Sequence, residues 1–193
     1  MKKAKTDKQK KIEQAVSQIL EAIGEDINRE GIRKTPERVA RMLDELLNGY
    51  GSHLQEYLKV FHETEKYEEM VLVRDIPFYS ICEHHLLPFF GKIHIAYIPR
   101  NGNVVGVSKL GRLADGFAHR LQMQERLTKQ IADSIMKALK PLGVLVIVEA
   151  EHLCMTIRGV KKPGSRITTS AMRGIFLSDA RTRSEALTLI GHR

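Results

Sequence analysis

Hydrophobic positions near the N-terminus recur at spacings of three and four residues. Between residues 9 and 23 the apolar side chains fall on one face, which predicts an amphipathic helix that ends at Gly24. A second helix is predicted to begin at Thr35, which would act as the N-cap, with Pro36 at the first helical position. We expect this second helix to stop near Gly51.

The pattern changes to that of strands after a polar stretch, residues 52–68, which we expect to be irregular. Residues 70–74 are apolar and β-branched, and residues 91–98 alternate between two faces, as strands do. Asn101-Gly102 follows the second of these strands and predicts a hairpin turn, since this dipeptide tolerates the positive φ angles of such turns. Cys82 therefore lies on the connection between two strands.

Helical periodicity returns over residues 108–140, where Ser108 can cap the first turn. The apolar stripe shifts near Gln122-Met123-Gln124, which predicts a break or kink there. A strand is then predicted over residues 144–158 and another over residues 167–170. The order of elements is a helical N-terminal third followed by ββααββ, which is typical of the α+β fold class.

The composition is that of one globular domain, or of one domain with an appended helical segment, since 42% of the 193 residues are hydrophobic. The longest apolar run, residues 144–148, is far too short to span a bilayer. The basic N-terminus lacks the apolar segment of a signal peptide. These features predict a cytoplasmic protein with reduced cysteines; the alternative is a disulfide between Cys82 and Cys154.

The net charge of +8 suggests an anionic partner, such as a nucleic acid, a nucleotide or a phosphorylated metabolite. Part of the excess lies in the lysine-rich N-terminus, which we expect to be a solvated tail. The remaining basic residues are dispersed and do not form the long Lys/Arg blocks expected of a nucleic-acid-binding arm.

The two cysteines each have a histidine close by in sequence. Cys82 precedes His85 by three residues, a spacing that lets both side chains reach one ion from a turn, and Cys154 follows His152 by two. Two thiolates and an imidazole suit zinc, and three protein ligands leave a fourth position for water, which is the catalytic pattern. His84 is less able to bind the same ion and is better placed for acid–base catalysis. A surface histidine pair is the alternative.

Strand periodicity would also orient the second cysteine cluster. If residues 144–158 form a regular strand, side chains two positions apart share a face. We expect one face to carry His152, Cys154, Thr156 and Arg158. The opposite positions are uniformly apolar and would face a core. A half-exposed strand with incidental polar side chains is the alternative interpretation.

Cationic side chains at a predicted helix start suggest a phosphate site. Lys109 and Arg112 follow Ser108 in a first turn whose free N–H groups favour an anion. Cations there oppose the helix dipole unless an anion lies between them, although a solvated basic helix start is the alternative. At the helix break, Gln124 and Glu125 can point into a pocket, and a carboxylate can accept two N–H donors from a guanine edge.

Four stretches together resemble a known family. They are Ser80-Ile81-Cys82-Glu83-His84-His85-Leu86-Leu87-Pro88-Phe89, Val107-Ser108-Lys109-Leu110, Gln124-Glu125-Arg126-Leu127-Thr128 and residues 149–159. In this order they resemble GTP cyclohydrolase I, the first enzyme of tetrahydrofolate and pterin biosynthesis. The match runs from about Thr35 to the C-terminus, and the first 30 or so residues match least.

The resemblance implies a tunnelling fold (T-fold), in which a four-stranded antiparallel sheet is backed by two helices. It divides the chain into an N-terminal helical segment, residues 1–68, and a catalytic T-fold domain, residues 69–193. In this family such sheets assemble into pentameric rings, two rings stack into a homodecamer, and the active sites lie between subunits.

The resemblance also implies a role for each candidate residue. Cys82, His85 and Cys154 would bind Zn²⁺, and water made acidic by the ion would attack C8 of the guanine of GTP. The catalytic set would be His84, His152 and Gln124, with His152 protonating the ring nitrogen as the imidazole ring opens. The substrate-binding set would be Glu125 at the guanine edge and, at the ribose-triphosphate end, Ser108, Lys109, Arg112 and Arg158. Loss of formate, an Amadori-type rearrangement and ring closure would then give 7,8-dihydroneopterin triphosphate.

Two other functions fit parts of the pattern. A zinc-stabilised, non-catalytic nucleotide- or nucleic-acid-binding protein fits the positive charge, but basic residues are dispersed, Trp is absent and a Cys/His quartet is lacking. A zinc nucleobase deaminase needs His-x-Glu and Pro-Cys-x-x-Cys, and the sequence contains neither motif. We therefore expect GTP as the partner, and neither nucleic acid nor a membrane.

Overall fold

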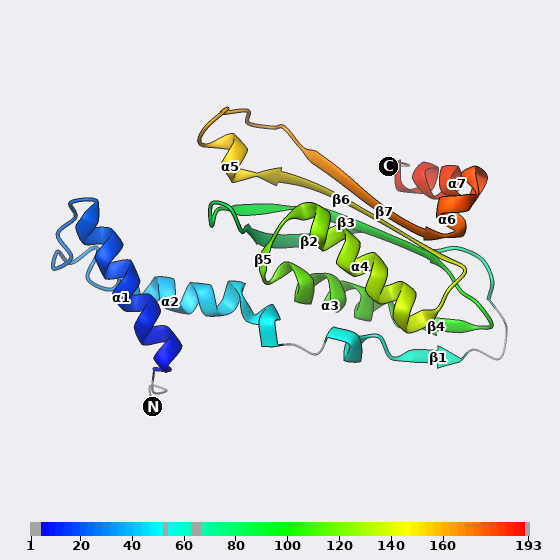
Figure 1. Ribbon diagram of the computed structural model, residues 1–193, viewed down its shortest axis with the longest axis horizontal. Helices are drawn as coiled ribbons and strands as arrows, with labels where there is room; N and C mark the ends of the chain where they lie inside the picture. The colour runs from blue at the N-terminus through cyan, green and yellow to red at the C-terminus, as the bar shows by residue number, and fades with distance from the viewer. Residues whose placement is uncertain (1–4, 52–53, 63–66, 192–193) are drawn as a thin grey trace. The chain divides into compact units, whose positions relative to one another are not determined.

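The computed structural model describes residues 5–51, 54–62 and 67–191 (Figure 1). The chain divides into two compact units, Met1–Asn48 and Gly49–Arg193. The described part of residues 49–68 thus lies with the sheet-containing unit, while residues 52–53 and 63–66 of the predicted irregular stretch lie outside the described residues. The assignment of catalysis to residues 69–193 stays a prediction.

The N-terminal unit contains the two predicted helices, α1 (Asp7–Ala22) and α2 (Thr35–Leu46). Thr6 and Gln9 form a capping box at the start of α1, so two of the unpaired N–H groups of its first turn are satisfied. The prediction that Thr35 is an N-cap is wrong, because Lys34 occupies that position without a side-chain cap. Pro36, the second residue of α2, is tolerated there because the N–H groups of a helix's first turn have no hydrogen-bond partner within the helix.

The second unit is built on a five-stranded sheet with the order β5-β2-β3-β6-β7. Four of the five strands pair antiparallel: β2 (Val71–Cys82), β3 (Pro88–Ile98), β6 (Gly143–His152) and β7 (Ile167–Gly174). The short strand β5 (Leu121–Gln122) adds parallel to the end of β2. The predicted four-stranded antiparallel sheet is therefore confirmed, with one short strand added at its edge.

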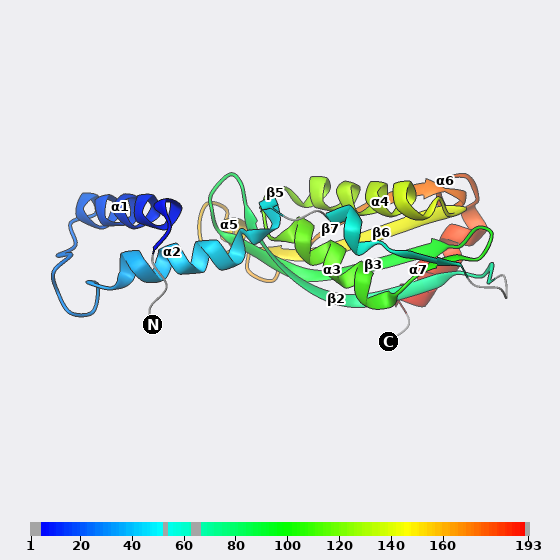
Figure 2. The same ribbon diagram turned by 90° about the horizontal axis from the view of Figure 1, so that it is seen from below.

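Helices α3 (Val107–Ala118) and α4 (Gln124–Leu139) cover one face of this sheet (Figures 1 and 2). Their apolar stripes pack in the main core, which includes Ile93, Ile95 and Tyr97 of β3. The predicted helix break is confirmed, since β5 separates the two helices. The prediction that Ser108 caps the first is wrong: Gly106 is the N-cap, so Ser108 lies inside the first turn.

The other face of the sheet is covered by two short C-terminal helices that the sequence pattern did not predict, α6 (Ile175–Ser178) and α7 (Ala180–Gly191). A second apolar cluster joins them to the sheet through Phe176, Ala186, Ala96 and Leu145. Both faces of the central strands are therefore buried, which explains the near-continuous apolar run of β6.

A separate pair of strands, β1 (Val60–His62) and β4 (Asn103–Val105), lies beyond the start of α3 (Figure 1). Two 3₁₀ turns, η1 (Asn48–Gly51) and η2 (Leu54–Tyr57), precede β1 in the chain, and η1 contacts the C-terminal end of α3 through Gly49 and His119. Residues 52–68 are therefore not irregular throughout. Asn101 and Gly102 do have positive φ angles, 56° and 73°. The hairpin prediction is wrong, however, because both edges of β3 are already bonded to β2 and β6, and β4 pairs with β1 instead.

Candidate metal centre and active site

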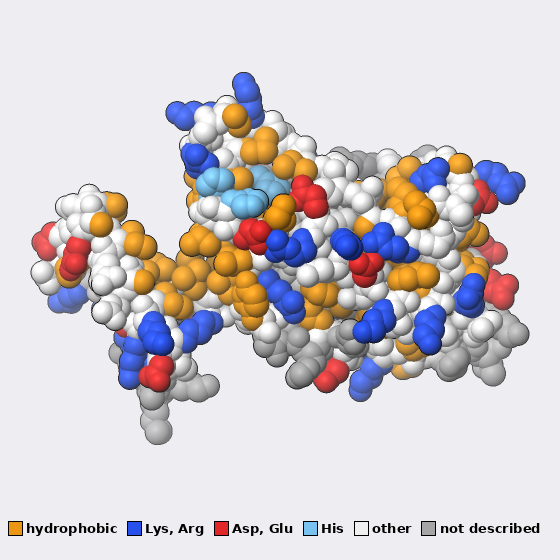
Figure 3. Space-filling view, in the orientation of Figure 1, with side chains coloured by type: hydrophobic (Ala, Val, Ile, Leu, Met, Phe, Trp, Pro, Cys, Tyr) orange, Lys and Arg blue, Asp and Glu red, His pale blue; other side chains and the backbone are white. Residues whose placement is uncertain are grey.

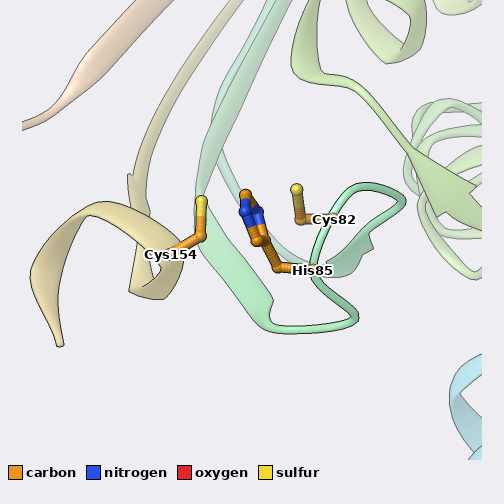
Figure 4. Close-up of side chains that lie close together, drawn as sticks. All are labelled: Cys82, His85 and Cys154. Atoms are coloured by element: carbon orange, nitrogen blue, oxygen red, sulfur yellow. The ribbon is translucent and has the colours of Figure 1, made fainter. Parts of the chain in front are cut away.

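Three potential metal ligands converge where β2 turns into β3. Cys82 is the last residue of β2, His85 lies in the turn, and Cys154 lies on α5 (Leu153–Thr156), a single helical turn that follows β6. One ligand atom from each lies within 4.8 Å of the others, and the three side chains point toward one another (Figure 4). Cys82 is buried, Cys154 is partly buried and His85 is exposed, so the group opens to solvent on one side.

The local backbone explains how the turn presents its two ligands. Cys82 N–H donates to Leu87 O and Leu86 N–H donates to Cys82 O, both at 2.9 Å. Leu86 takes a φ of 54°, in the left-handed region, which reverses the chain within a few residues. The prediction that Cys82 and His85 can reach one ion from a turn is consistent with this geometry.

The strand predicted over residues 144–158 is wrong in its second half. β6 ends at His152, which pairs with Phe89, and the chain then forms α5. Thr156 Oγ1 donates back to His152 O at 3.1 Å, an i to i−4 bond that belongs to a helical turn. His152, Cys154 and Arg158 therefore do not share a strand face.

The helical turn nevertheless brings Cys154 and Arg158 to the same histidine, His85. Arg158 donates to His85 Nε2 at 2.8 Å, across the gap between α5 and the β2–β3 turn. On the surface, histidine side chains gather at one place beside Lys and Arg side chains (Figure 3). Of the four side chains predicted to share a strand face, Cys154 and Arg158 both reach His85, through a helical turn and not through strand alternation.

The donor set fits a divalent transition metal. Ligand–metal distances of about 2.0–2.3 Å place tetrahedral ligand atoms roughly 3.5 Å apart, so small side-chain movements suffice from the observed spacing. Burial, together with the neighbouring Cys82 thiol, raises the pKa of Cys154 above its usual value. A metal ion would offset this by favouring the thiolate. Cys82 and Cys154 are both free cysteines, as predicted for reduced thiols.

His152 precedes Cys154 by two residues and is partly buried, in a polar network with Gln124. Its ring stacks on Phe89 with centroids 4.5 Å apart and an interplanar angle of 11°. Its Nε2 lies 2.8 Å from Gln124 Oε1, at the start of α4. Burial lowers the pKa of His152, while the charge of Glu125 acts in the opposite direction. A weakly basic imidazole is therefore held next to a carboxylate.

His84 lies in the same turn but is exposed. Its Nδ1 lies 3.9 Å from Cys82 Sγ, and its ring meets that of His85 edge-on at 6.3 Å. The preceding Glu83 accepts two bonds from Arg126 of α4, which hold its pKa below the usual range. This ion pair ties the ligand-bearing turn to the helix that carries Gln124, and the sequence analysis missed it.

Glu125 is exposed and lines a pocket of about 560 Å³ between α4 and β7. The pocket walls include Thr128 and Thr169, which are part of the Gln124 network, and Arg173. This volume is within the range of small-molecule sites. The three metal-ligand candidates do not line it.

The predicted phosphate-binding residues Ser108, Lys109 and Arg112 are not brought to the metal-ligand group. The last residue of α3, Ala118, contacts Ser80 near the end of β2, so it is the C-terminal end of the helix that approaches the group. Ser108 lies near the other end, about 15 Å away along the helix axis. The start of α3 is accordingly displaced toward β4 in Figure 1. Of the predicted cationic residues, Arg158 is the one that reaches the group.

Sequence reasoning also missed Phe89, Thr128 and Thr169, which support the candidate catalytic residues. Thr128 follows Gln124 by four residues on one helix, a spacing that could have indicated contact. Thr169 is 45 positions from Gln124, and no local signal connects them.

Comparison with known proteins gives a consistent family. A sequence model of GTP cyclohydrolase I matches residues 12–191. A GTP cyclohydrolase 1 from Carboxydothermus hydrogenoformans is 63% identical over 183 residues, covering 95% of each chain. The enzyme of the same name from Clostridioides difficile is 60% identical, covering 96% of this chain and 97% of its own.

Among solved structures, an archaeosine synthase QueF-like protein in its apo form superposes with a TM-score of 0.46 and 21% identity, covering 56% of this chain and 97% of its own. The family model and the curated relatives span nearly the whole chain. The chain belongs to the GTP cyclohydrolase I family of T-fold enzymes.

Proposed function

We propose that this chain converts GTP and water to 7,8-dihydroneopterin triphosphate and formate, with Zn²⁺ as its metal. The observation that carries the proposal is the convergence of Cys82, His85 and Cys154, with the hydrogen-bonded pair of His152 and Gln124 joined to it through His152, two residues before Cys154 in the chain. The family to which the chain belongs, and the names of its relatives, support the same reaction.

Cys82, His85 and Cys154 would hold the zinc ion, since two thiolates and one imidazole make a three-ligand site with an open fourth position. When bound, Zn²⁺ supplies Lewis acidity that activates water at neutral pH. The exposed side of the group, next to His85, is where substrate can enter.

His152 is the proposed proton donor to the guanine ring nitrogen as the five-membered ring opens. Its stacking on Phe89 and its bond to Gln124 fix the ring, which general acid catalysis requires. His84, exposed in the same turn, is the proposed second proton carrier. Gln124 belongs to the catalytic machinery through its contact with His152.

Glu125 is proposed to anchor the guanine edge. It follows Gln124 directly, lines the pocket, and acts electrostatically on His152, so its carboxylate is close to the proposed proton donor. A carboxylate can accept two N–H bonds from guanine, and an adenine edge does not offer the same pair of donors. This would favour GTP over ATP.

The ribose-triphosphate end requires Ser108, Lys109, Arg112 and Arg158. Arg158 already lies at the metal-ligand group, whereas the other three lie toward the opposite end of the sheet. We propose that a second copy of the chain brings its own Ser108, Lys109 and Arg112 to the site. The assembly would be a homodecamer of two stacked pentamers, as the family resemblance implies.

The proposed setting is the cytoplasm, where the reaction would be the first step of tetrahydrofolate or pterin biosynthesis. Within the part of the chain that the structure describes, no helix is both long and apolar enough to cross a membrane. The paired reduced thiols are consistent with a reducing compartment.

The reaction can be tested with purified, zinc-loaded protein and GTP. Mass spectrometry is expected to detect formate and dihydroneopterin triphosphate in equal amounts, and the dihydropterin is expected to fluoresce. Unchanged GTP, with zinc shown to be bound, would contradict the proposal. ATP in place of GTP serves as the control and is expected to remain intact.

A further inference from the structure

Gln124 is completely buried, and both ends of its side-chain amide have partners. Only 1% of the residue is exposed. The amide nitrogen donates to the main-chain oxygens of Val148 and Ile167, each at 2.9 Å, and lies 3.2 Å from Thr169 Oγ1. Main-chain carbonyl oxygens can only accept, so the nitrogen must face them. The chemistry of the surroundings therefore fixes which way this amide points.

The fixed amide turns its oxygen toward His152. Gln124 Oε1 lies 2.8 Å from His152 Nε2, and an amide oxygen cannot donate, so Nε2 must carry the proton in this bond. We propose that Gln124 is a positioning residue: it holds His152 as the Nε2–H tautomer, so that Nδ1 is the nitrogen that exchanges a proton with the substrate. The tautomer stands on geometry alone, whereas the role of Nδ1 rests on the proposed function.

Two threonines complete the network and leave it with one consistent set of donors. Thr128 Oγ1 donates to the main-chain oxygen of Gln124 at 2.7 Å. Its proton is then used, so the 2.6 Å contact with Thr169 Oγ1 must be donated by Thr169. Thr169 Oγ1 in turn lies 3.2 Å from the amide nitrogen of Gln124, whose two protons are shared among this hydroxyl and the two carbonyl oxygens. A buried network in which each hydroxyl proton has one acceptor resists rearrangement.

Phe89 prevents the ring of His152 from exchanging its two nitrogens easily. The two rings stack at 4.5 Å, and Phe89 is fully buried in the main core. Among the described residues, none forms a hydrogen bond with His152 Nδ1. That nitrogen therefore has a lone pair in the neutral ring, so it can take up a proton, and the imidazolium formed in this way can donate that proton to the substrate from Nδ1.

The tautomer can be read by NMR of the full-length, zinc-loaded protein with ¹⁵N,¹³C-labelled histidine, at a pH where the ring is neutral. Nε2 is bonded to Cδ2 and Nδ1 to Cγ, so correlation with these carbons identifies the protonated nitrogen. The signals of His152 are those that disappear in His152→Ala. We expect the proton on Nε2, and a proton on Nδ1 in the wild-type protein would overturn the proposal.

The role of Gln124 can be tested with a matched control. Gln122 is equally buried, at 1% exposure, but its amide donates to Phe117 O and Gln130 Oε1 and does not contact His152. Gln124→Ala is expected to populate the Nδ1–H tautomer and to lower kcat about 10- to 100-fold, part of what general acid catalysis contributes. Gln122→Ala is expected to keep the wild-type tautomer, and to keep kcat within about 2-fold.

Gln124→Glu supplies the conservative rescue. A neutral carboxylic acid can donate to one buried carbonyl and still accept from His152 Nε2–H, so this variant is expected to regain the tautomer and most of the lost kcat. Zinc content and melting temperature are measured for each variant. Wild-type kcat in Gln124→Ala, or equal losses in Gln122→Ala, would overturn the proposal.

Failure of the proposed function would give a different result. If wild-type protein leaves GTP intact but shows the Nε2–H signal, the proposed tautomer stands and the proposed role of Nδ1 is refuted. If turnover is normal but the signal shows a proton on Nδ1, the proposed function stands and the proposal that Gln124 positions His152 is refuted.

Discussion

The two ends of the sheet carry different chemistry. Where β2 turns into β3, the thiols of Cys82 and Cys154 and the imidazole of His85 converge, and the partly buried His152 lies two residues before Cys154. The start of α3, toward the opposite end, carries a hydroxyl and two cations, those of Ser108, Lys109 and Arg112. One chain therefore presents a centre suited to breaking a bond at one end and a surface suited to binding phosphate at the other. The proposed function therefore requires that two copies of the chain combine these ends in one site.

The largest expected effect is at the metal end. Cys154→Ala leaves two of three zinc ligands, so we expect loss of both zinc and detectable GTP turnover. Zinc is measured by metal analysis of the purified protein and turnover by formate release. Cys154→Ala protein that retains stoichiometric zinc and wild-type turnover would refute the assignment of this ligand.

His152→Ala should separate metal binding from proton transfer. We expect zinc to be retained and kcat to fall about 10²- to 10⁴-fold, the usual contribution of general acid–base catalysis. His119, at the C-terminal end of α3, bonds to Asp115 O and provides a matched histidine outside the site. His119→Ala is expected to turn over GTP normally, and a His152→Ala variant that did the same would contradict the proposed proton transfer.

Removing a cation at the start of α3 should weaken substrate binding without changing the zinc content. Lys109→Ala is expected to raise the KM for GTP about 10- to 100-fold with full zinc content, since it removes a charge-assisted contact with phosphate. Steady-state kinetics and metal analysis are compared with those of Lys137→Ala, which alters an exposed lysine in the last turn of α4. Loss of zinc in Lys109→Ala would show that the two ends are not separate.

The smallest expected effect is on the stability of the fold, at a histidine in β3. His94 is buried in β3 and accepts a hydrogen bond from Asp75 N–H at 3.2 Å, where β2 bulges. Burial lowers the pKa of His94 below that of the unfolded chain, against the opposing charges of Asp75 and Glu149. As the pH falls below about 6.5, the unfolded state therefore takes up a proton first and the free energy of unfolding decreases.

Thermal melting between pH 7 and pH 5 can measure this effect. His94→Gln keeps an acceptor but does not titrate, so its melting temperature is expected to vary less with pH than that of the wild type. Equal pH dependence in the two proteins would exclude His94 as the cause.

The part of the candidate site that the sequence predicted is the part set by local geometry. Cys82 and His85 are three residues apart in one turn, and the helix break at Gln124 followed from a shift in the apolar stripe. The region after His152 was mispredicted because its alternation of polar and apolar residues also fits a helical turn, and four residues are too few to distinguish the two periods.

Other features depend on contacts between distant residues. The pairing of β4 with β1 followed from both edges of β3 being occupied, which no dipeptide signal can indicate. The network around Gln124 joins α4 to β6 and β7, so its partners could be identified only from the fold. The C-terminal helices were missed because they are short and their apolar residues cover only part of the sheet.

The central claim is that the two ends work together across copies of the chain, and complementation tests it most directly. Cys154→Ala chains are co-expressed with Lys109→Ala/Arg112→Ala chains under different tags, and mixed oligomers are isolated by both tags. Random assembly of equal amounts leaves about one quarter of the sites with both ends intact, so about a quarter of wild-type turnover is expected at low GTP. Mixed Cys154→Ala and His85→Ala chains, which share one defective end, are expected to stay inactive. Inactive mixed oligomers of the first kind, with their composition verified, would contradict the account.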